Sequence, residues 1–172
     1  MRQRPLMIAA LAALAMSSTV LAQTPGNGPK KDEVVGFRES DAVMNAAIAE
    51  ARRSLPTFWR LLETDPVVAA SGKIKVGFDT PGGPEHMWVR EVRREGAVVK
   101  GLLDNRPVWL KGFAKGDPVT IDPADISDWS YIREERMYGS YTTRVMLPHL
   151  PAEQREAYRK FLSDKPLEDR RP

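Results

Sequence analysis

Alternating apolar and polar residues predict a series of short β-strands through the middle of the chain. Between residues 73 and 78, the apolar residues Ile74, Val76 and Phe78 alternate with lysines and a glycine. This two-residue period is typical of a strand with one buried face. Turns rich in Gly, Pro, Asn and Asp separate the other predicted strands. These lie at 85–92, 98–103, 119–121, 126–132 and 141–146, with a short apolar segment at 108–111 and an edge strand at 33–37.

The strand predicted at 85–92 is expected to be central in the sheet and to have two different faces. One face would carry His86, Trp88, Arg90 and Val92, and the other Glu85, Met87, Val89 and Glu91. Met87 and Val89 are expected to face the core. Because Trp and Arg are enriched at binding hot spots, the His86 face is a candidate binding surface. The alternative is a packing role, in which Trp88 lies under a loop with His86 hydrogen-bonded beside it.

Apolar residues recur every three or four positions before the first long strand, which predicts an amphipathic helix that covers the sheet. The stripe consists of Met44, Ala47, Ile48, Ala51, Leu55, Phe58 and Leu62. Ser40 is expected to cap the helix, with Asp41 in its first turn. Pro56 removes a backbone donor, so two helical pieces, 41–53 and 56–63, are expected to meet at a kink.

The order of the predicted elements indicates an α+β fold. Asp65 and Pro66 are expected to end the helical unit. A closing helix is predicted at 151–163, where Pro151 suits the first turn. A run of about five to seven strands between terminal helices favours a small, antiparallel, strongly curved sheet, packed by the N-terminal kinked helix and the C-terminal helix.

The first 22 residues have the pattern of a secretory signal peptide. Arg2 and Arg4 precede an apolar segment, and Val20 and Ala22 are small residues at the expected cleavage positions. Cleavage is therefore predicted between Ala22 and Gln23. The alternative, an uncleaved membrane anchor, is disfavoured because the apolar segment at 6–21 is shorter than the roughly 20 residues that span a bilayer.

These features predict how the chain is organised and where it is located. We expect a signal peptide at 1–22, a flexible tether at 23–32, a single domain at 33–163 and a charged tail at 164–172. The protein is expected in the periplasm or secreted, with no stable membrane insertion after cleavage.

Composition excludes several classes of protein. The chain has no cysteine, so disulfides, thiolate chemistry and a lipid-anchored cysteine are excluded. Without Arg2 and Arg4, 24 basic and 23 acidic residues remain, and this balance gives no reason to expect a nucleic-acid partner. A domain of about 150 residues buries roughly 68–70% of its unfolded surface, so its core suffices without such cross-links.

Five short motifs follow one another along the middle of the chain. They are EHMWV at 85–89, GLLDNRP at 101–107, GDPV at 116–119, ISDW at 126–129 and GSYTTR at 139–144. In this order they resemble the YegJ-like family of uncharacterised bacterial proteins, the domain-of-unknown-function family numbered 2314. The resemblance extends from about residue 41 to residue 145. It supports the domain and the motif positions, but it implies no mechanism, because the family has no established activity or catalytic residue.

The sequence offers little support for catalysis. The chain has two histidines, and His149 lies in a predicted surface loop, whereas a metal site needs three or four convergent ligands. Asp125 and Asp128 could join a site with His86, but spacing alone is weak evidence, so no metal site and no cofactor are predicted. Neither a Gly-x-Ser-x-Gly turn nor a phosphate-binding glycine loop is present.

Three functional hypotheses remain open. The first is a non-catalytic binding module for an unknown envelope protein or small ligand; blocking a toxin in the envelope would fit this class. Its candidate residues are His86, Trp88, Arg90, Asp128, Trp129, Thr142 and Arg144. The second is an envelope hydrolase with His86 as the general base, oriented by Asp128. The third is a purely structural envelope protein. Asp128 and Arg144 are alternatively expected to form a structural ion pair between two paired strands.

Overall fold

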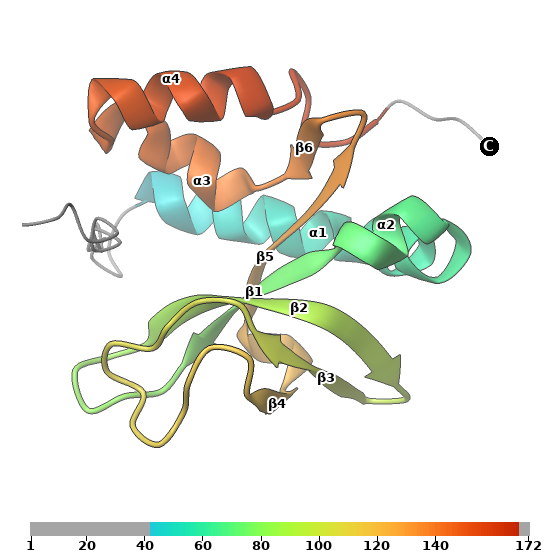
Figure 1. Cartoon of the computed structure of the whole chain (residues 1–172), viewed down its shortest axis with the longest axis vertical. Helices are drawn as coiled ribbons and strands as arrows, with labels where there is room; N and C mark the ends of the chain where they lie inside the picture. Colours follow the sequence, from blue (N-terminus) through green and yellow to red (C-terminus); the bar gives the residue numbers. More distant parts are fainter. Residues whose placement is uncertain (1–41, 169–172) are drawn as a thin grey trace, which may run out of the picture. The chain divides into compact units, whose positions relative to one another are not determined.

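The computed structural model describes residues 42–168, and within them the fold is α+β, as predicted (Figure 1). Six strands form one antiparallel sheet in the order β4-β3-β2-β1-β5-β6. The strands are β1 (Lys73–Phe78), β2 (Glu85–Glu95), β3 (Val98–Leu103), β4 (Pro118–Ile121), β5 (Ile126–Arg133) and β6 (Arg136–Gly139). The helices are α1 (Ala42–Thr64), α2 (Pro66–Ser71), α3 (Tyr141–Met146) and α4 (Ala152–Phe161), with short 3₁₀ turns η1 (Pro123–Asp125) and η2 (Leu147–His149).

The first helix is one continuous element, where two helical pieces, 41–53 and 56–63, were expected to meet at a kink. α1 runs through Pro56 without interruption. The apolar stripe keeps its phase on both sides of the proline, and buried Ala51 and Phe58 anchor the two halves to the same core. This shared packing outweighs the one lost hydrogen bond. The predicted signal peptide, tether, edge strand at 33–37 and cap at Ser40 and Asp41 lie outside the described residues.

A short helix, α2, follows α1 directly and was not predicted. Asp65 caps it, because the Asp65 carboxylate accepts a hydrogen bond from the Val67 N–H at 2.9 Å. Pro66 occupies the first helical position, where its missing N–H has no cost. The Asp-Pro pair that ends α1 therefore also begins the next helix.

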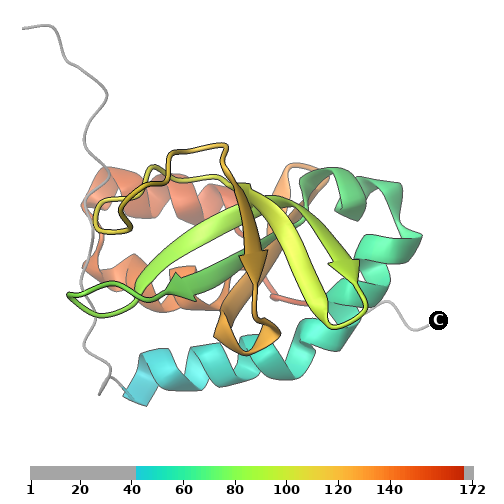
Figure 2. The same ribbon diagram turned by 90° about the horizontal axis from the view of Figure 1, so that it is seen from below.

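The core lies on one face of the sheet. Its buried residues are Ala51, Phe58, Trp59, Val68, Ile74, Val76, Met87, Val89, Val92, Val99, Leu103, Val119, Ile121, Ile126, Trp129, Tyr131 and Tyr141. α1 covers this face, and the Trp129 ring stacks on Phe58 with centroids 5.3 Å apart. In Figure 2, β2, β3 and β4 lie in front of α3 and α4.

A bulge in β2 corrects the predicted faces of this strand. Met87 and Val89 are buried, as expected, but Val92 is also buried instead of sharing the His86 face. Glu91 has a φ of 53°, and the register with β3 shifts between Arg90 and Arg93. The extra residue returns Val92 to the core side.

The prediction of a last strand at 141–146 was wrong, because this segment forms α3. The strand that follows β5 and forms a hairpin with it is β6, which ends at Gly139. Gly139 and Ser140 have φ values of 67° and 54°, and these turn the chain away from the sheet. The backbone N–H groups of Tyr141 and Thr142 then bond to the Asp128 carboxylate on β5.

Two further segments differ from the strands and helix expected there. Residues 108–111 lie in the loop between β3 and β4 and form no strand. α4 ends at Phe161, so it is shorter than predicted, and buried Leu162 forms a bridge with Met137. The first part of the predicted tail also contacts the sheet, where the Gly139 N–H donates to the Pro166 carbonyl at 2.8 Å.

Candidate functional site

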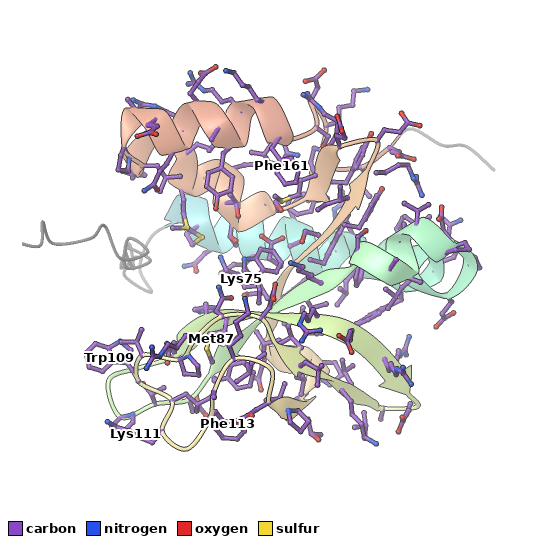
Figure 3. The ribbon with its side chains drawn as sticks, viewed as in Figure 1. Lys75, Met87, Trp109, Lys111, Phe113 and Phe161 are labelled. Atoms are coloured by element: carbon purple, nitrogen blue, oxygen red, sulfur yellow. The ribbon has the colours of Figure 1, made fainter. Side chains whose placement is uncertain are left out.

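The sheet face opposite the core carries a group of polar residues centred on Lys75. Lys75 lies directly opposite Trp88 on β2 and Asp128 on β5, and Gly77 lies opposite His86. Residues paired in this way share a face. We define the Lys75 site as Lys75, His86, Trp88, Ser127, Asp128 and Thr142. Figure 3 shows Lys75 between the sheet and α3, which supplies Thr142.

Asp128 is the fully buried anchor of this site. Its carboxylate accepts bonds from the N–H groups of Trp129 at 2.8 Å, Tyr141 at 3.1 Å and Thr142 at 2.8 Å, and from the Thr142 hydroxyl at 2.6 Å. Burial raises the pKa of Asp128 and outweighs the Thr142 bonds and the Lys75 charge, which lower it. Asp128 therefore fixes the N-terminus of α3 against β5.

The Lys75 amine is partly buried between Thr142 and Trp88. It donates to the Thr142 hydroxyl at 3.0 Å and lies 5.4 Å from the centre of the Trp88 ring. Burial lowers the pKa of Lys75, although the nearby Asp128 charge opposes this shift. An ammonium has three donors, and within residues 42–168 only one of these has an acceptor. Two N–H donors therefore remain for another molecule.

His86 stands beside Lys75 and is exposed to solvent. Its Nδ1 lies 3.0 Å from the Ser127 hydroxyl, which in turn lies 3.3 Å from the Lys75 carbonyl. Gly77 leaves room for the ring, because a Cβ there would lie 3.2 Å from the imidazole. Partial desolvation lowers the pKa of His86, and the charges of Lys75 and Arg52 lower it further.

The structure brings together four of the residues singled out from the sequence, namely His86, Trp88, Asp128 and Thr142. Arg90 lies at the edge of the site, with its Nε 3.7 Å from Asp104. The other two candidates, Trp129 and Arg144, form their hydrogen bonds with residues outside the site.

Trp129 points into the core, where its indole N–H donates to the Ala51 carbonyl and the Ser54 hydroxyl, both at 3.1 Å. The expected Asp128–Arg144 ion pair does not form. Arg144 instead donates to the Gly139 carbonyl at 3.0 Å and to the Ser163 carbonyl at 2.9 Å.

Sequence reasoning missed Lys75, Ser127 and Gly77. Lys75 was treated as an ordinary outward residue of an alternating strand. Its importance depends on the pairing of β1 with β5, and only the Ser127-Asp128 motif gave a hint of a polar site there.

Residues 42–168 contain no group of three or more His, Cys, Asp or Glu side chains placed to hold a metal ion. Within the same range, no helix has both the length and the apolar character needed to cross a membrane.

Comparison with known proteins identifies the family. The family model described as "Uncharacterized protein conserved in bacteria (DUF2314)" matches residues 41–163. The chain belongs to this family. The match includes every residue of the Lys75 site. No solved structure gives a significant match.

The sequence of this DUF2314 protein is similar to those of two bacterial proteins. It is 28% identical to an uncharacterized protein, YegJ, of Escherichia coli K12 over 149 residues, covering 87% of this chain and 96% of the relative. It is 31% identical to a putative ankyrin repeat protein of Neisseria meningitidis serogroup B over 133 residues, covering 72% of this chain. That match spans 53% of the Neisseria protein, about half its length.

Proposed function

We propose that this protein is an exported, non-catalytic binding module that holds an anionic group of a small ligand or an envelope protein at the Lys75 site. The observation that carries the proposal is the Lys75 ammonium, which lies beside exposed His86 and partly exposed Trp88 and has two donors without an acceptor in residues 42–168. A carboxylate or phosphate would accept these donors, and a planar group would stack on the indole.

The charges around the site favour an anion. Asp128 lies fully buried beneath Lys75 and is occupied by its own hydrogen bonds. Asp104 is shared among Lys73, Arg90 and Lys115, at N–O distances of 2.6, 3.7 and 3.8 Å. Exposed Glu91 also pairs with Arg90. The four cations Lys73, Lys75, Arg90 and Lys115 still outnumber the two accessible carboxylates, and a ligand carboxylate would reduce their mutual repulsion.

Export to the periplasm forms part of the same proposal. It rests on the charged, apolar and small-residue pattern of residues 1–22. The absence of cysteine is compatible with either an oxidising or a reducing compartment, so it does not decide the location.

A hydrolase is the second candidate, because the His86 imidazole lies 3.0 Å from a serine hydroxyl. Two features weaken it. Ser127 is buried, with 1% of its surface exposed, so a substrate carbonyl has poor access to its oxygen. Asp128 does not orient the His86 imidazole, because the four hydrogen bonds that its carboxylate accepts come from Trp129, Tyr141 and Thr142.

A titration followed by protein NMR tests the binding proposal. Benzoate serves as a planar anionic probe, and benzamide as its neutral counterpart. We expect benzoate to shift the signals of His86 and the Trp88 indole, and to raise the pKa of His86. The Lys75→Met variant should bind benzoate about tenfold more weakly, since a hydrogen bond to a charged group contributes roughly 1.5–3 kcal/mol.

Lys100→Met is the matched control, because it removes the same charge from an exposed residue of β3 whose side chain has Glu95 as its only ion-pair partner among the described residues. It should leave binding unchanged. Equal shifts with benzamide, or equal losses in the two variants, would contradict an anion site at Lys75. Turnover of a benzoate ester that depends on both His86 and Ser127 would favour the hydrolase instead.

A further inference from the structure

The loop between β3 and β4, residues 104–117, is held in one conformation by bonds to its backbone. The Glu85 carboxylate accepts three consecutive N–H groups, from Val108 at 2.7 Å and from Trp109 and Leu110 at 2.9 Å. The Asp117 carboxylate accepts the Ala114 N–H at 2.8 Å. The loop thus has a fixed shape without a core of its own.

This ordered loop exposes large apolar side chains. Trp109 is 61% exposed, Val108 is 53% exposed and Phe113 is 44% exposed. Figure 3 shows Trp109, Lys111 and Phe113 along the loop, on the far side of the sheet from α4. The Glu85 bonds hold the backbone at Val108 and Trp109, so the loop does not fold over these two side chains and bury them. The exposure of these side chains is therefore built into the fold.

Between Asp104 and Asp117 at its two ends, the loop carries only basic charges. Arg106, Lys111 and Lys115 lie among the apolar residues, and no acidic residue occurs from 105 to 116. Arg106 and Lys111 are exposed and have no hydrogen bond or ion pair within the described residues. Lys115 approaches only Asp104, at 3.8 Å.

We propose that this loop, the aromatic-basic loop, binds the surface of a bilayer that contains anionic lipids. Trp and Phe insert at the boundary between headgroups and acyl chains, while Lys and Arg attract the anionic headgroups. Trp, Phe and Arg also suit a protein interface, but the two lysines favour an anionic bilayer, because lysine is depleted at protein interfaces. The proposal does not depend on a ligand at the Lys75 site.

A local fluorescent label tests this inference in the full chain. The chain has no cysteine, so Phe113→Cys can be labelled specifically with an environment-sensitive dye. Glu156→Cys on α4 provides the control position. The apolar segment at 6–21 is present in both proteins and could bring either to a vesicle, so the readout must report the surroundings of the loop itself.

With vesicles containing phosphatidylglycerol, we expect the fluorescence emission of the label at 113 to become stronger and to shift to shorter wavelength. With pure phosphatidylcholine, the emission should change little. The label at 156 should not respond. Adding Arg106→Glu and Lys111→Glu should weaken the response at least about tenfold, because each basic residue near an anionic surface contributes to binding. High salt should weaken it as well.

Three outcomes would overturn the inference. The first is no response at 113 with anionic vesicles. The second is an equal response at 113 and 156, which would mean that another part of the chain brings the protein to the lipid. The third is a lipid-independent change at 113 that grows with protein concentration, which would assign the loop to contact with a second copy.

Discussion

Thr142 is the residue that connects the buried and accessible parts of the Lys75 site. Its hydroxyl donates to Asp128 at 2.6 Å and accepts from Lys75 at 3.0 Å. The same side chain thus satisfies the carboxylate that anchors α3 and holds the partly buried Lys75 amine. A change at Thr142 should therefore affect both the fold and the position of Lys75.

Replacing Thr142 with valine should lower the free energy of unfolding by about 1–3 kcal/mol. Valine keeps the shape but leaves the buried Asp128 with one bond fewer and Lys75 with no acceptor among the described residues. Thr142→Ser keeps the hydroxyl and should cost less. Urea unfolding of the three proteins measures the difference, and a smaller loss for Thr142→Val than for Thr142→Ser would mean that packing, rather than the hydroxyl, matters.

The sequence identified several residues of the site but not the residue at its centre. His86 and Trp88 stood out because both residue types are rare in this chain. Lys75 looked like any solvent-facing lysine of an alternating strand. Its role depends on lying between Trp88 and Asp128, and this requires the strand order, which local patterns do not encode.

At the scale of elements, Glu85 couples a strand to the aromatic-basic loop. Desolvation raises the pKa of Glu85, but the bonds from Val108, Trp109 and Leu110 together lower it below the ordinary value of 4.5. A carboxylate with a lowered pKa stabilises the loop above pH 4.5. This stabilisation is lost as the pH falls through the lowered pKa.

Glu85→Gln should loosen the loop at neutral pH. The amide has one acceptor oxygen in place of two and no charge, so it cannot hold all three N–H groups as well. We expect the protection factors of the Val108, Trp109 and Leu110 amides against hydrogen exchange to fall at least about tenfold, as they also should in the native protein when the pH falls through the lowered pKa of Glu85.

Glu63→Gln is the control for this loop, because Glu63 is an exposed residue of α1. It should leave exchange in the loop unchanged. If Glu85→Gln also left it unchanged, the turn residues and the Asp117 bond would be sufficient to order the loop.

The segment at 141–146 shows why local preference can fail for a whole element. Tyr, Thr and Val favour strands, and the sequence therefore predicted one. The structure has α3 instead, because Asp128 accepts the first N–H groups of this segment and the Ser140 N–H donates to the Trp129 carbonyl at 2.8 Å. A long-range contact from β5 overrides the local preference.

At the scale of the whole described region, the fold class was predictable because periods of two and of three to four residues are local. The helix-then-strands order gave the α+β class, and the β2–β3 hairpin followed from the turn at Gly96. The β1–β5 pairing and the position of the C-terminal segment were not predictable, since both depend on contacts between residues far apart in the sequence.

Arg133 joins three such distant parts of the chain. From β5, its guanidinium forms ion pairs with Asp65, which caps α2, and with Glu168 in the C-terminal segment. Only 8% of the Arg133 side chain is exposed. Both carboxylates pair with the same buried cation, so removing the arginine should disturb α2 and the C-terminal segment together.

Arg133→Met should lower the free energy of unfolding by about 3 kcal/mol, because it leaves two partly buried carboxylates without their cation. Arg136→Met, on the adjacent strand, should cost about 1 kcal/mol or less, since its bond to the Lys160 carbonyl lies at the exposed surface and its ion-pair partner Asp164 is 98% exposed. Denaturant unfolding compares the two. Glu168→Gln should fall between them, because the Asp65 pair remains. If Arg133→Met cost no more than Arg136→Met, the C-terminal segment would be held chiefly by Leu162, Leu167 and the Gly139–Pro166 bond.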